Sequence, residues 1–391
     1  MAELTPSPGG AADWKSIAAM WSELSCLSAC PQDPVHHAEG DVATHTRMVL
    51  DELVSCDEWR SLPSERRRLL FWAAVFHDVG KPGTTVLEPD GRISSAGHSR
   101  LGASIARHLL WEAGAPVPFR EELCGLIAAH QLPFWLFERD DAAKAACRTA
   151  LSCRPSDLLT HASADAKGRF CGDRAEILDR VALSRIVFDE LGILDAPYPF
   201  ANPESRYAFF ERESRPPDYA AHEEFRCQAT LVCGLPGTGK DTWIGRNIPD
   251  TPVVSLDALR LEMGIAHGDN QGRLIQAAFE SAREHLRAGR DFAWNAVNVT
   301  RQNREKVTRL LRDYGARIRI VYLEVPRETL LLQNASRAAS VPEDAVLRLA
   351  RKMEPPRADE AHEVTWLFSG ERIHAVGEPP DAAPSPAPAS P

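Results

Sequence analysis

Side chains of the kinds that bind divalent metal ions recur in the first half of the sequence, on the apolar sides of expected helices. In FWAAVFHDVGKPG, residues 71–83, an apolar run is followed by His77 and Asp78, and then by glycines and a proline that end the helix. Burying these two polar groups without partners is unfavourable, so a hydrogen bond, water or a metal ion must satisfy them. The helical period directs four further residues of this kind inward from other helices: His45, His98, His130 and Asp165.

One such histidine alone is commonly a hydrogen-bonded core residue. Five helices that each direct a ligand-type residue inward favour a metal centre instead. Imidazoles and carboxylates without thiolates suit first-row divalent ions, and Asp78 can bridge two ions at the ~3.5–4 Å separation used in phosphoester hydrolysis. Lys81 and Arg169 follow two of these residues, and they are expected either to contact phosphate or to be solvated helix ends.

A phosphate-binding loop begins the second half. LVCGLPGTGKDTW, residues 231–243, follows an expected strand and opens an expected helix, so that backbone N–H groups and a lysine can hold ATP or another NTP. Asp241 stands where Ser or Thr normally meets Mg²⁺, and Thr242 lies ~100° further round the helix. We therefore expect a modified magnesium shell. The predicted nucleotide-binding residues are Gly234, Gly237, Thr238, Gly239, Lys240, Asp241 and Thr242.

Two later segments supply candidates for phosphoryl transfer. In SLDALR, residues 255–260, Asp257 follows a strand end and can accept a proton from an attacking hydroxyl, while Arg260 can hold an anionic acceptor. The alternative is that Asp257 is a helix N-cap and Arg260 a surface cation. Residues 324–349 are expected to form a lid whose Arg337 closes on the transferred phosphoryl group.

Further basic and aromatic residues allow contacts with nucleic acid. Arg301 and Arg304 begin a basic segment just past a strand end, where they are expected to contact ligand. Phe134, Trp135 and Phe137 can stack a base, although local core or lid packing is the favoured interpretation.

The elements that must position these residues differ between the two halves. Residues 14–195 have helical periodicity, whereas short β-rich runs at 229–233, 252–256, 292–297 and 318–325 alternate with helices and indicate a parallel sheet. The predicted fold is an all-helical domain followed by a P-loop parallel-sheet domain with a helical lid. We predict a helical domain at 14–198, a linker at 199–226, a P-loop domain at 227–376 and a disordered tail at 377–391.

Composition limits the class of protein. With 391 residues, 44% of them hydrophobic and 26% charged, the chain is long enough for about two or three domains. No apolar run approaches the ~20 residues of a membrane span, and the N-terminus lacks the features of an export signal. Nine scattered cysteines are expected to be reduced thiols, which favours a cytoplasmic protein without a membrane partner. The net charge of −10 argues against a generally basic nucleic-acid coat.

The ordered blocks HHAEGDVATHT, FHDVGKP, GHSRLGA and ADAKGR resemble the HD superfamily of metal-dependent phosphohydrolases. The resemblance implies that His45, His77, Asp78 and Asp165 hold one metal ion. It further implies that His98 and His130, with Asp78 bridging, hold a second ion of the Mn²⁺, Fe²⁺, Co²⁺, Ni²⁺ or Zn²⁺ class. His161, one turn before Asp165, is expected to support a ligand.

The second half resembles polynucleotide 5′-kinases, including the run NASR…VP…VL. That family has two lid arginines one turn apart, whereas here the first position is Gln333, and Arg327 is a possible substitute. Together the halves resemble the bacterial bifunctional HD–polynucleotide kinase end-healing enzymes. This implies removal of 2′-, 3′- or 2′,3′-cyclic phosphate by one domain and phosphorylation of 5′-OH ends by the other. RNA or DNA ends are the expected partners, and the absence of a KxDG motif leaves sealing to a separate ligase.

Two alternatives remain open from the sequence. In the first, the helical domain is a nucleotidase and the P-loop domain phosphorylates a small molecule such as a nucleoside or sugar. In the second, the P-loop domain senses nucleotide and regulates the hydrolase, an interpretation favoured by Asp241 and Gln333.

Overall fold

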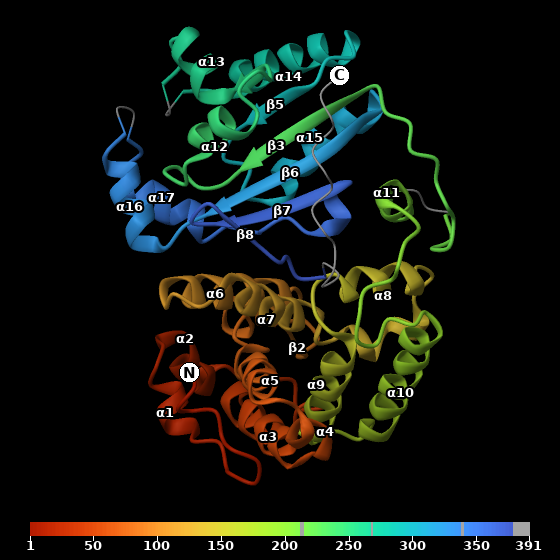
Figure 1. Cartoon of the computed structure of the whole chain (residues 1–391). Coiled ribbons are helices and arrows are strands. Elements are labelled where there is room, and N and C mark those ends of the chain that lie inside the picture. Colours follow the sequence, from red (N-terminus) through yellow and green to blue (C-terminus); the bar gives the residue numbers. More distant parts are fainter. Residues whose placement is uncertain (212–214, 267–268, 338–339, 378–391) are drawn as a thin grey trace.

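The computed structural model describes residues 1–211, 215–266, 269–337 and 340–377. A helical part lies beside a part built on one large sheet, and helices α6, α7 and α8 of the former face the latter (Figure 1). The predicted order, an all-helical domain followed by a P-loop parallel-sheet domain, is confirmed.

The helical part positions its polar residues mainly through helix ends. Its helices are α1 (Trp14–Ala18), α2 (Ser22–Ser25), α3 (Val42–Ser55), α4 (Asp57–Ser61), α5 (Ser64–Phe76), α6 (His98–Glu112), α7 (Val117–Ala129), α8 (Ala142–Ala150), α9 (Pro155–Lys167) and α10 (Arg174–Glu190). Asp41 caps α3 by accepting from the backbone N–H of Thr44, which fixes where that helix begins. At Gly80, an added Cβ would lie 2.2 Å from the carbonyl oxygen of His98, so only glycine permits the close approach of α5's end to α6.

The sheet part contains a six-stranded sheet in the order β4-β5-β3-β6-β7-β8. Its strands are β3 (Cys227–Cys233), β4 (Val253–Ser255), β5 (Phe292–Asn295), β6 (Ala316–Glu324), β7 (Glu363–Phe368) and β8 (Glu371–Ile373). All neighbouring pairs are parallel except β7 with β8. The carboxyl ends of the parallel strands therefore meet at one edge, which is where such sheets bind ligands.

Helices connect these strands and cover the sheet. They are α12 (Lys240–Asn247), α13 (Leu256–Glu262), α14 (Gly272–Arg287), α15 (Arg301–Asp313), α16 (Arg327–Ala335) and α17 (Glu343–Ala350). Ala278, Ala282 and Leu286 of α14 belong to the same buried cluster as Leu231 of β3 and Ile320 of β6. Val232 of β3 and Val321 of β6 belong to a second buried cluster with Ile244 of α12, so both faces of the sheet are covered, as a parallel sheet requires.

Several elements differ from those expected. The four predicted strands exist, but the second ends at Ser255 and the third at Asn295. The short hairpin β1 (Val86–Leu87) and β2 (Ile93–Ser94), and strands β7 and β8, were not predicted. The lid segment is helical at α16 and α17, while residues 338–339 of it lie outside the described residues, as do 212–214 of the linker and 378–391 of the tail. The domain boundaries stay predictions.

The expected linker contains α11 (Pro203–Glu211), which packs against both parts. Phe209 and Phe210 join the buried cluster of α8 and α10, whereas Tyr207 joins the core of the sheet part. Trp111 and Val117, at facing ends of α6 and α7, also enter the core of the sheet part. The helical part and the sheet part therefore pack against each other through buried apolar side chains.

A buried ion pair ties α7 to the sheet. Arg120 Nη1 and Nη2 donate to the two carboxylate oxygens of Glu324, the last residue of β6, at 2.7 and 2.8 Å. Tyr322 Oη also donates to Glu324, and Glu121 accepts from Arg107 and Arg120. Burial opposes the charge of Arg120, but Glu324 and Glu121 outweigh it and hold its pKa well above the ordinary value. This network fixes α7 against the sheet.

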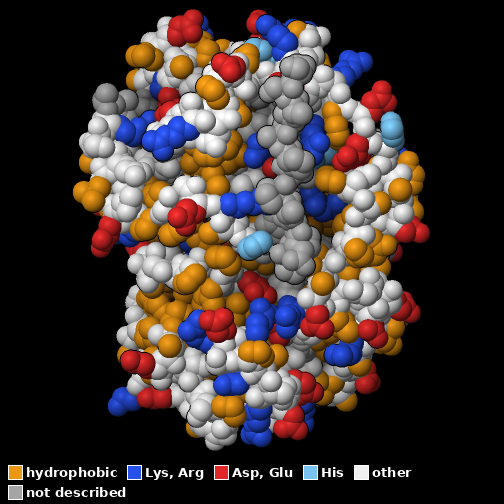
Figure 2. Space-filling view, in the orientation of Figure 1, with side chains coloured by type: hydrophobic (Ala, Val, Ile, Leu, Met, Phe, Trp, Pro, Cys, Tyr) orange, Lys and Arg blue, Asp and Glu red, His pale blue; other side chains and the backbone are white. Residues whose placement is uncertain are grey.

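No helix among the described residues is long and apolar enough to cross a membrane. Acidic and basic side chains are intermixed over both parts of the molecule on the face shown in Figure 2. On that face the charge pattern matches the expectation that the chain has no general basic coat.

Candidate active sites

The six predicted metal ligands converge in the helical part, and all are buried. His45 lies inside α3 and Asp165 inside α9, His98 begins α6, and the other residues lie at or just past helix ends. Their exposed fractions are 0% for His45, His77 and Asp165, 1% for Asp78 and His130, and 4% for His98. Five helices thus bring together side chains that are up to 120 positions apart in the sequence.

Asp78 lies at the centre of the cluster, and each of its oxygens faces a different pair of imidazoles. Oδ2 lies 3.2 Å from Nε2 of His77 and 3.8 Å from Nε2 of His45. Oδ1 lies 3.3 Å from Nε2 of His98 and 3.8 Å from Nε2 of His130. Asp165 Oδ1 lies 3.1 Å from His45 Nε2. Two ligand groups that share one carboxylate are the arrangement that a bridged pair of ions requires.

Backbone carbonyls set the tautomers of these histidines. Nδ1 of His77, His98 and His130 lies 2.7, 2.7 and 2.8 Å from the carbonyl oxygens of Ala74, Ser95 and Ile127, each three residues earlier. Since a carbonyl only accepts, the proton sits on Nδ1 and the lone pair of Nε2 points toward Asp78. Metal-binding histidines are held in this way.

The polar atoms of the cluster favour a cation at its centre. Both oxygens of Asp78 and Nε2 of His77 are buried, and they lack a hydrogen-bond partner of good geometry within the described part of the chain. Burial raises the pKa of Asp78, but the nearby His77 and Lys81 outweigh it and hold the pKa well below its ordinary value. Burial, with His77 nearby, lowers the pKa of His130. An anionic carboxylate among imidazoles fits first-row divalent ions.

Two cations lie against the acidic residues. Lys81 Nζ lies 2.8 Å from Asp78 Oδ2, and Arg169 donates to both oxygens of Asp165 at 2.8–3.0 Å. Burial raises the pKa of Asp165, but the Arg169 guanidinium outweighs it and holds the pKa well below its ordinary value. Because Lys81 is 6% and Arg169 9% exposed, the alternative that they are solvated helix ends is wrong.

Sequence reasoning missed Glu39. Its Oε1 lies 2.9 Å from Nδ1 of His45 and 2.8 Å from Nδ1 of His37, and its Oε2 accepts from the backbone N–H of Phe170. Glu39 therefore orients His45 so that Nε2 faces Asp78, as the carbonyls do for the other histidines. The signal in the sequence is the block HHAEGDVATHT, in which Glu39 precedes the candidate ligand His45.

His161 lies inside the cluster but makes no hydrogen bond there. Its ring centroid is 5.4 Å from that of His77 and 6.0 Å from that of His130, and both of its nitrogens lack partners among the residues described. Burial, with His77 nearby, lowers its pKa to about 3, so this imidazole is neutral. Support of a ligand by His161 remains a prediction.

The phosphate-binding loop follows β3 and leads into α12, as expected. Gly234, Gly237 and Gly239 have φ angles of 154°, 92° and 86°, which only glycine adopts readily. Lys240 Nζ donates to the carbonyl oxygens of Gly234 and Leu235 at 2.9 and 3.0 Å. Burial, with Arg337 nearby, lowers the pKa of Lys240 to about 8.

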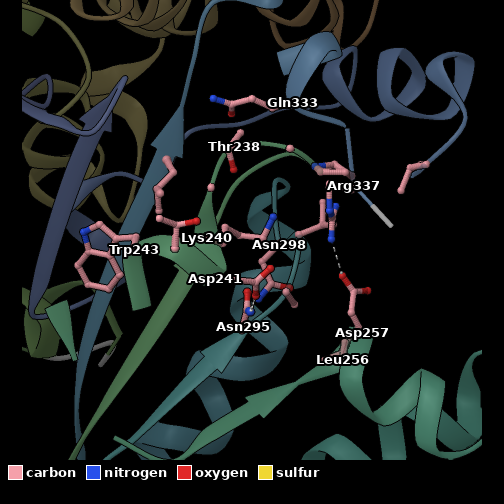
Figure 3. A pocket seen from close by; sticks show the side chains of 18 of the residues that line it. Thr238, Lys240, Asp241, Trp243, Leu256, Asp257, Asn295, Asn298, Gln333 and Arg337 are labelled. Carbon is pink, nitrogen blue, oxygen red and sulfur yellow. Dashed lines mark hydrogen bonds and ion pairs between the residues drawn. The ribbon is translucent and has the colours of Figure 1, made fainter. Parts of the chain in front are cut away.

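The other expected residues of the sheet part gather across a cleft from this loop (Figure 3). Asp257 lies in the first turn of α13, where its Oδ1 accepts from Arg260 at 2.6 Å and its Oδ2 lies 3.5 Å from Nη2 of Arg337. The N-cap of α13 is Ser255, so the alternative that Asp257 is the N-cap is wrong. Gln333 lines the cleft, whereas Arg327 is not among the described residues that do so.

The cleft has a volume of about 1320 Å³. Small-molecule sites usually occupy roughly 300–1,000 Å³, so this cleft has room for more than one substrate. Among the described residues, all seven predicted nucleotide-binding positions except Gly234 line it. Glu324, the partner of Arg120, lines it as well.

Arg304 and Arg301, which were expected to contact ligand, are not among the described residues that line the cleft. Arg304 is 0% exposed and donates to Glu360 and to the carbonyl oxygens of Asn298 and Glu354, while Arg301 is paired with Asp359. They act as structural cations, because they tie the start of α15 to the segment before β7, and Arg304 also holds the loop after β5. Asn298, whose carbonyl oxygen accepts from Arg304, lines the cleft with a φ of 41°, which is rare for a non-glycine residue.

The aromatic cluster after His130 is divided between core and surface. Phe134 is 4% exposed, with the Arg169 guanidinium 4.9 Å from its ring, so it belongs to the core as favoured. Trp135 and Phe137 are 54% and 59% exposed, and Phe170, next to Arg169, is 57% exposed. Exposed aromatic rings thus lie shortly after His130 (Trp135 and Phe137) and shortly after Asp165 (Phe170).

Comparison with known families gives the same division. Residues 42–157 match the HD domain family, and residues 230–356 match an AAA domain family. The chain therefore joins a helical part that matches the HD domain family to a P-loop part that matches an AAA domain family. The match to the HD family ends before Asp165, so that position rests on the geometry of the cluster.

Similar proteins of known name match parts of the chain. A CC-adding tRNA nucleotidyltransferase of Thermus thermophilus is 37% identical over 109 residues, which are 28% of this chain and 23% of that protein. An A-adding tRNA nucleotidyltransferase of Deinococcus radiodurans is 43% identical over 68 residues, 17% of this chain and 16% of that protein. The chain thus spans about a quarter or less of these relatives. A solved structure of a candidate kinase from Chloroflexus aurantiacus is 19% identical, covers 37% of this chain and 87% of its own, and has a TM-score of 0.32.

Proposed function

We propose that this chain heals the ends of broken nucleic-acid strands. The HD domain removes 2′-, 3′- or 2′,3′-cyclic phosphate, and the P-loop domain transfers the γ-phosphate of ATP to a 5′-OH. The observation that carries the hydrolase half is the pairing of His77 and His45 with one oxygen of Asp78, and of His98 and His130 with the other.

In the hydrolase half, His45, His77, Asp78, His98, His130 and Asp165 would hold two divalent ions, which supply Lewis acidity and an activated water for phosphoester hydrolysis. Lys81 and Arg169 add positive charge beside the acidic ligands and so offset the negative charge of a phosphate end. Trp135, Phe137 and Phe170 offer exposed rings on which the terminal bases stack, each worth about 1–3 kcal/mol.

In the kinase half, the loop of residues 234–242 binds ATP and Asp257 accepts the proton of the 5′-OH. Its neighbours Arg260 and Arg337, which already contact it, hold the acceptor phosphate and the transferred phosphoryl group. Gln333 leaves Arg337 without a second lid arginine at the position one turn earlier. A cleft of about 1320 Å³ accommodates a nucleotide together with a strand end.

The proposal as a whole draws support from the names of relatives that match the HD domain, which refer to tRNA nucleotidyltransferases. Strands with a 5′-OH and a phosphorylated 3′ end need both reactions before they can be joined, so the two activities belong together chemically. Sealing falls to a separate ligase.

The test uses one labelled oligonucleotide with a 5′-OH and a 3′-phosphate, incubated with ATP and divalent ions. We expect Asp78→Ala to lose only 3′-phosphate removal and Lys240→Ala to lose only 5′ phosphorylation. Phosphorylation of a bare nucleoside or sugar, but not of a 3′-phosphorylated dinucleotide, would contradict the proposal in favour of a small-molecule kinase joined to a nucleotidase.

One observation favours a second candidate, in which the P-loop domain senses nucleotide and regulates the hydrolase. Glu324 lines the nucleotide cleft and is also bound to Arg120 of α7, the helix that ends at the candidate ligand His130. Nucleotide binding that alters 3′-phosphate removal, without phosphoryl transfer to any oligonucleotide, would support this candidate instead.

A further inference from the structure

The side chains of Asp241 and Asn295 meet at the carboxyl edge of the sheet. Asn295 is the last residue of β5 and is 7% exposed, and its Nδ2 donates to Oδ1 of Asp241 at 2.5 Å. Asp241 is the second residue of α12, directly after Lys240. Figure 3 shows the two side chains directed toward each other on the floor of the nucleotide cleft.

In P-loop nucleoside triphosphatases, Mg²⁺ is held by a hydroxyl that follows the loop lysine and by an aspartate on a strand. Here β5 pairs in parallel with β3, with Val232 opposite Asn295, so the end of β5 lies beside the start of the loop. Asp241 occupies the place of the hydroxyl, and Asn295 ends the strand that lies beside the loop. The carboxylate is on the loop and the uncharged side chain is on the strand.

We propose that these two positions have exchanged roles, so that Asp241 supplies the anionic oxygen for Mg²⁺ and Asn295 orients it. This inference rests on the proposed binding of Mg²⁺ and nucleotide by the P-loop domain. Magnesium prefers carboxylate oxygens, and it commonly takes one or two of them together with substrate phosphates. The amide of Asn295 engages Oδ1, which leaves Oδ2 of Asp241 for the ion.

The exchange keeps the charge of the pair constant. The usual arrangement has one carboxylate and one neutral side chain, and so does this one. An aspartate at 295 beside Asp241 would place two carboxylates at hydrogen-bond distance, where one must stay protonated or the pair must separate. A serine at 241 beside Asn295 would leave no carboxylate at either position.

A reciprocal exchange tests the proposal. The variants are Asp241→Ser, Asn295→Asp and the double substitution Asp241→Ser/Asn295→Asp, all in the full-length chain. Binding of a fluorescent ATP analogue is titrated with Mg²⁺ and with EDTA, in the absence of any acceptor. Asp250→Asn, which removes an exposed carboxylate just past α12, is the matched control.

We expect each single variant to raise the Mg²⁺ concentration for half-maximal binding by about tenfold or more, the usual effect of losing or misorienting a metal ligand. The double variant should return to within about threefold of the wild type, because it restores the usual P-loop arrangement. Binding in EDTA should stay near the wild-type level in all variants, which shows that the loop is folded.

A double variant as weak as the weaker single variant would overturn the proposal, as would a single variant with unchanged Mg²⁺ dependence. Either outcome would show that the contact between Asp241 and Asn295 is a structural hydrogen bond with no role in binding Mg²⁺. Because no oligonucleotide is present, these outcomes are distinct from failure of the proposed 5′-kinase activity, which leaves Mg²⁺-dependent nucleotide binding unchanged.

Discussion

The two candidate active sites are built in opposite ways. The HD centre is buried: its six candidate ligands are at most 4% exposed, and backbone carbonyls or Glu39 orient its imidazoles. The P-loop cleft is open, and the side chain of Asp257 is 66% exposed. A buried site of this kind is arranged before substrate arrives, whereas an open one completes its contacts with the substrate. Substitutions should therefore have different effects in the two sites.

The largest effect is expected at the centre of the buried site. Asp78→Asn removes the charge shared by the two groups of imidazoles, and loss of several kcal/mol of transition-state stabilisation lowers 3′-phosphate removal by about a thousandfold or more. Metal content measured on the purified protein should fall in parallel. The exposed Asp90→Asn variant serves as control. Full metal content in Asp78→Asn would contradict the bridging role.

The open site should lose activity without losing stability. Asp257→Asn removes a proton acceptor, which usually contributes about 10²–10⁴-fold, and slows phosphorylation of the strand's 5′-OH accordingly. Because the side chain is largely exposed, the free energy of unfolding should change by less than about 0.5 kcal/mol. Denaturant unfolding and the rate of phosphoryl transfer at saturating substrate check the two parts, and an unchanged rate would remove Asp257 from the reaction.

A smaller effect is expected one layer outside the metal cluster. Glu39→Gln weakens the orientation of His45, and such changes usually reduce metal affinity about 10–100-fold. Excess metal ion should then restore the rate of phosphate removal, which a purely structural defect would not allow. Competition with a chelating dye measures the affinity, and Glu65→Gln, at an exposed position, is the control.

The smallest effect concerns the contact between the two domains. Asp359 is bound by Arg301, by Arg357 and by Arg148 of the HD domain. Burial raises the pKa of Asp359, but Arg357 and Arg301 outweigh it and hold the pKa well below its ordinary value of 3.8. A depressed pKa means that the stabilisation is complete above pH 3.8 and is lost as the pH falls further.

Asp359→Asn should therefore lower the free energy of unfolding by about 1–3 kcal/mol at pH 7. The difference from wild type should shrink below pH 3.8. Unfolding by urea at a series of pH values measures this difference, with the exposed Asp313→Asn as control. A difference that persists unchanged at low pH would show that the carboxylate charge is not what stabilises the contact.

The sequence predicted best what depends on local pattern. Helical periodicity placed His45, His98 and Asp165 inward, and the glycine-rich loop was recognised between strand and helix. Strands β7 and β8 were missed, since they come late in the chain with a weak alternating pattern. The residue types, their spacing and a bridging Asp78 were all expected from the sequence, and the folded chain brings these residues together.

Residues whose partners are distant in the sequence were predicted poorly. Arg304 was expected at the ligand because it follows a strand end, yet its partner Glu360 is 56 positions away. Asn295 was not singled out, because its significance depends on Asp241, 54 positions earlier. Neither pairing leaves a local signal in the sequence, because the two residues of each pair meet only in the folded chain.

Helix α7 carries one more consequence. In the first turn of α7, Arg120 is paired with Glu324, which lines the cleft. The C-cap of the same helix is His130, which lies beside Asp78. This one helix, about three and a half turns long, thus spans the distance between the cleft and the candidate metal site. The spacing between the two sites therefore cannot change unless the Arg120–Glu324 pair and the packing around it break, or α7 bends.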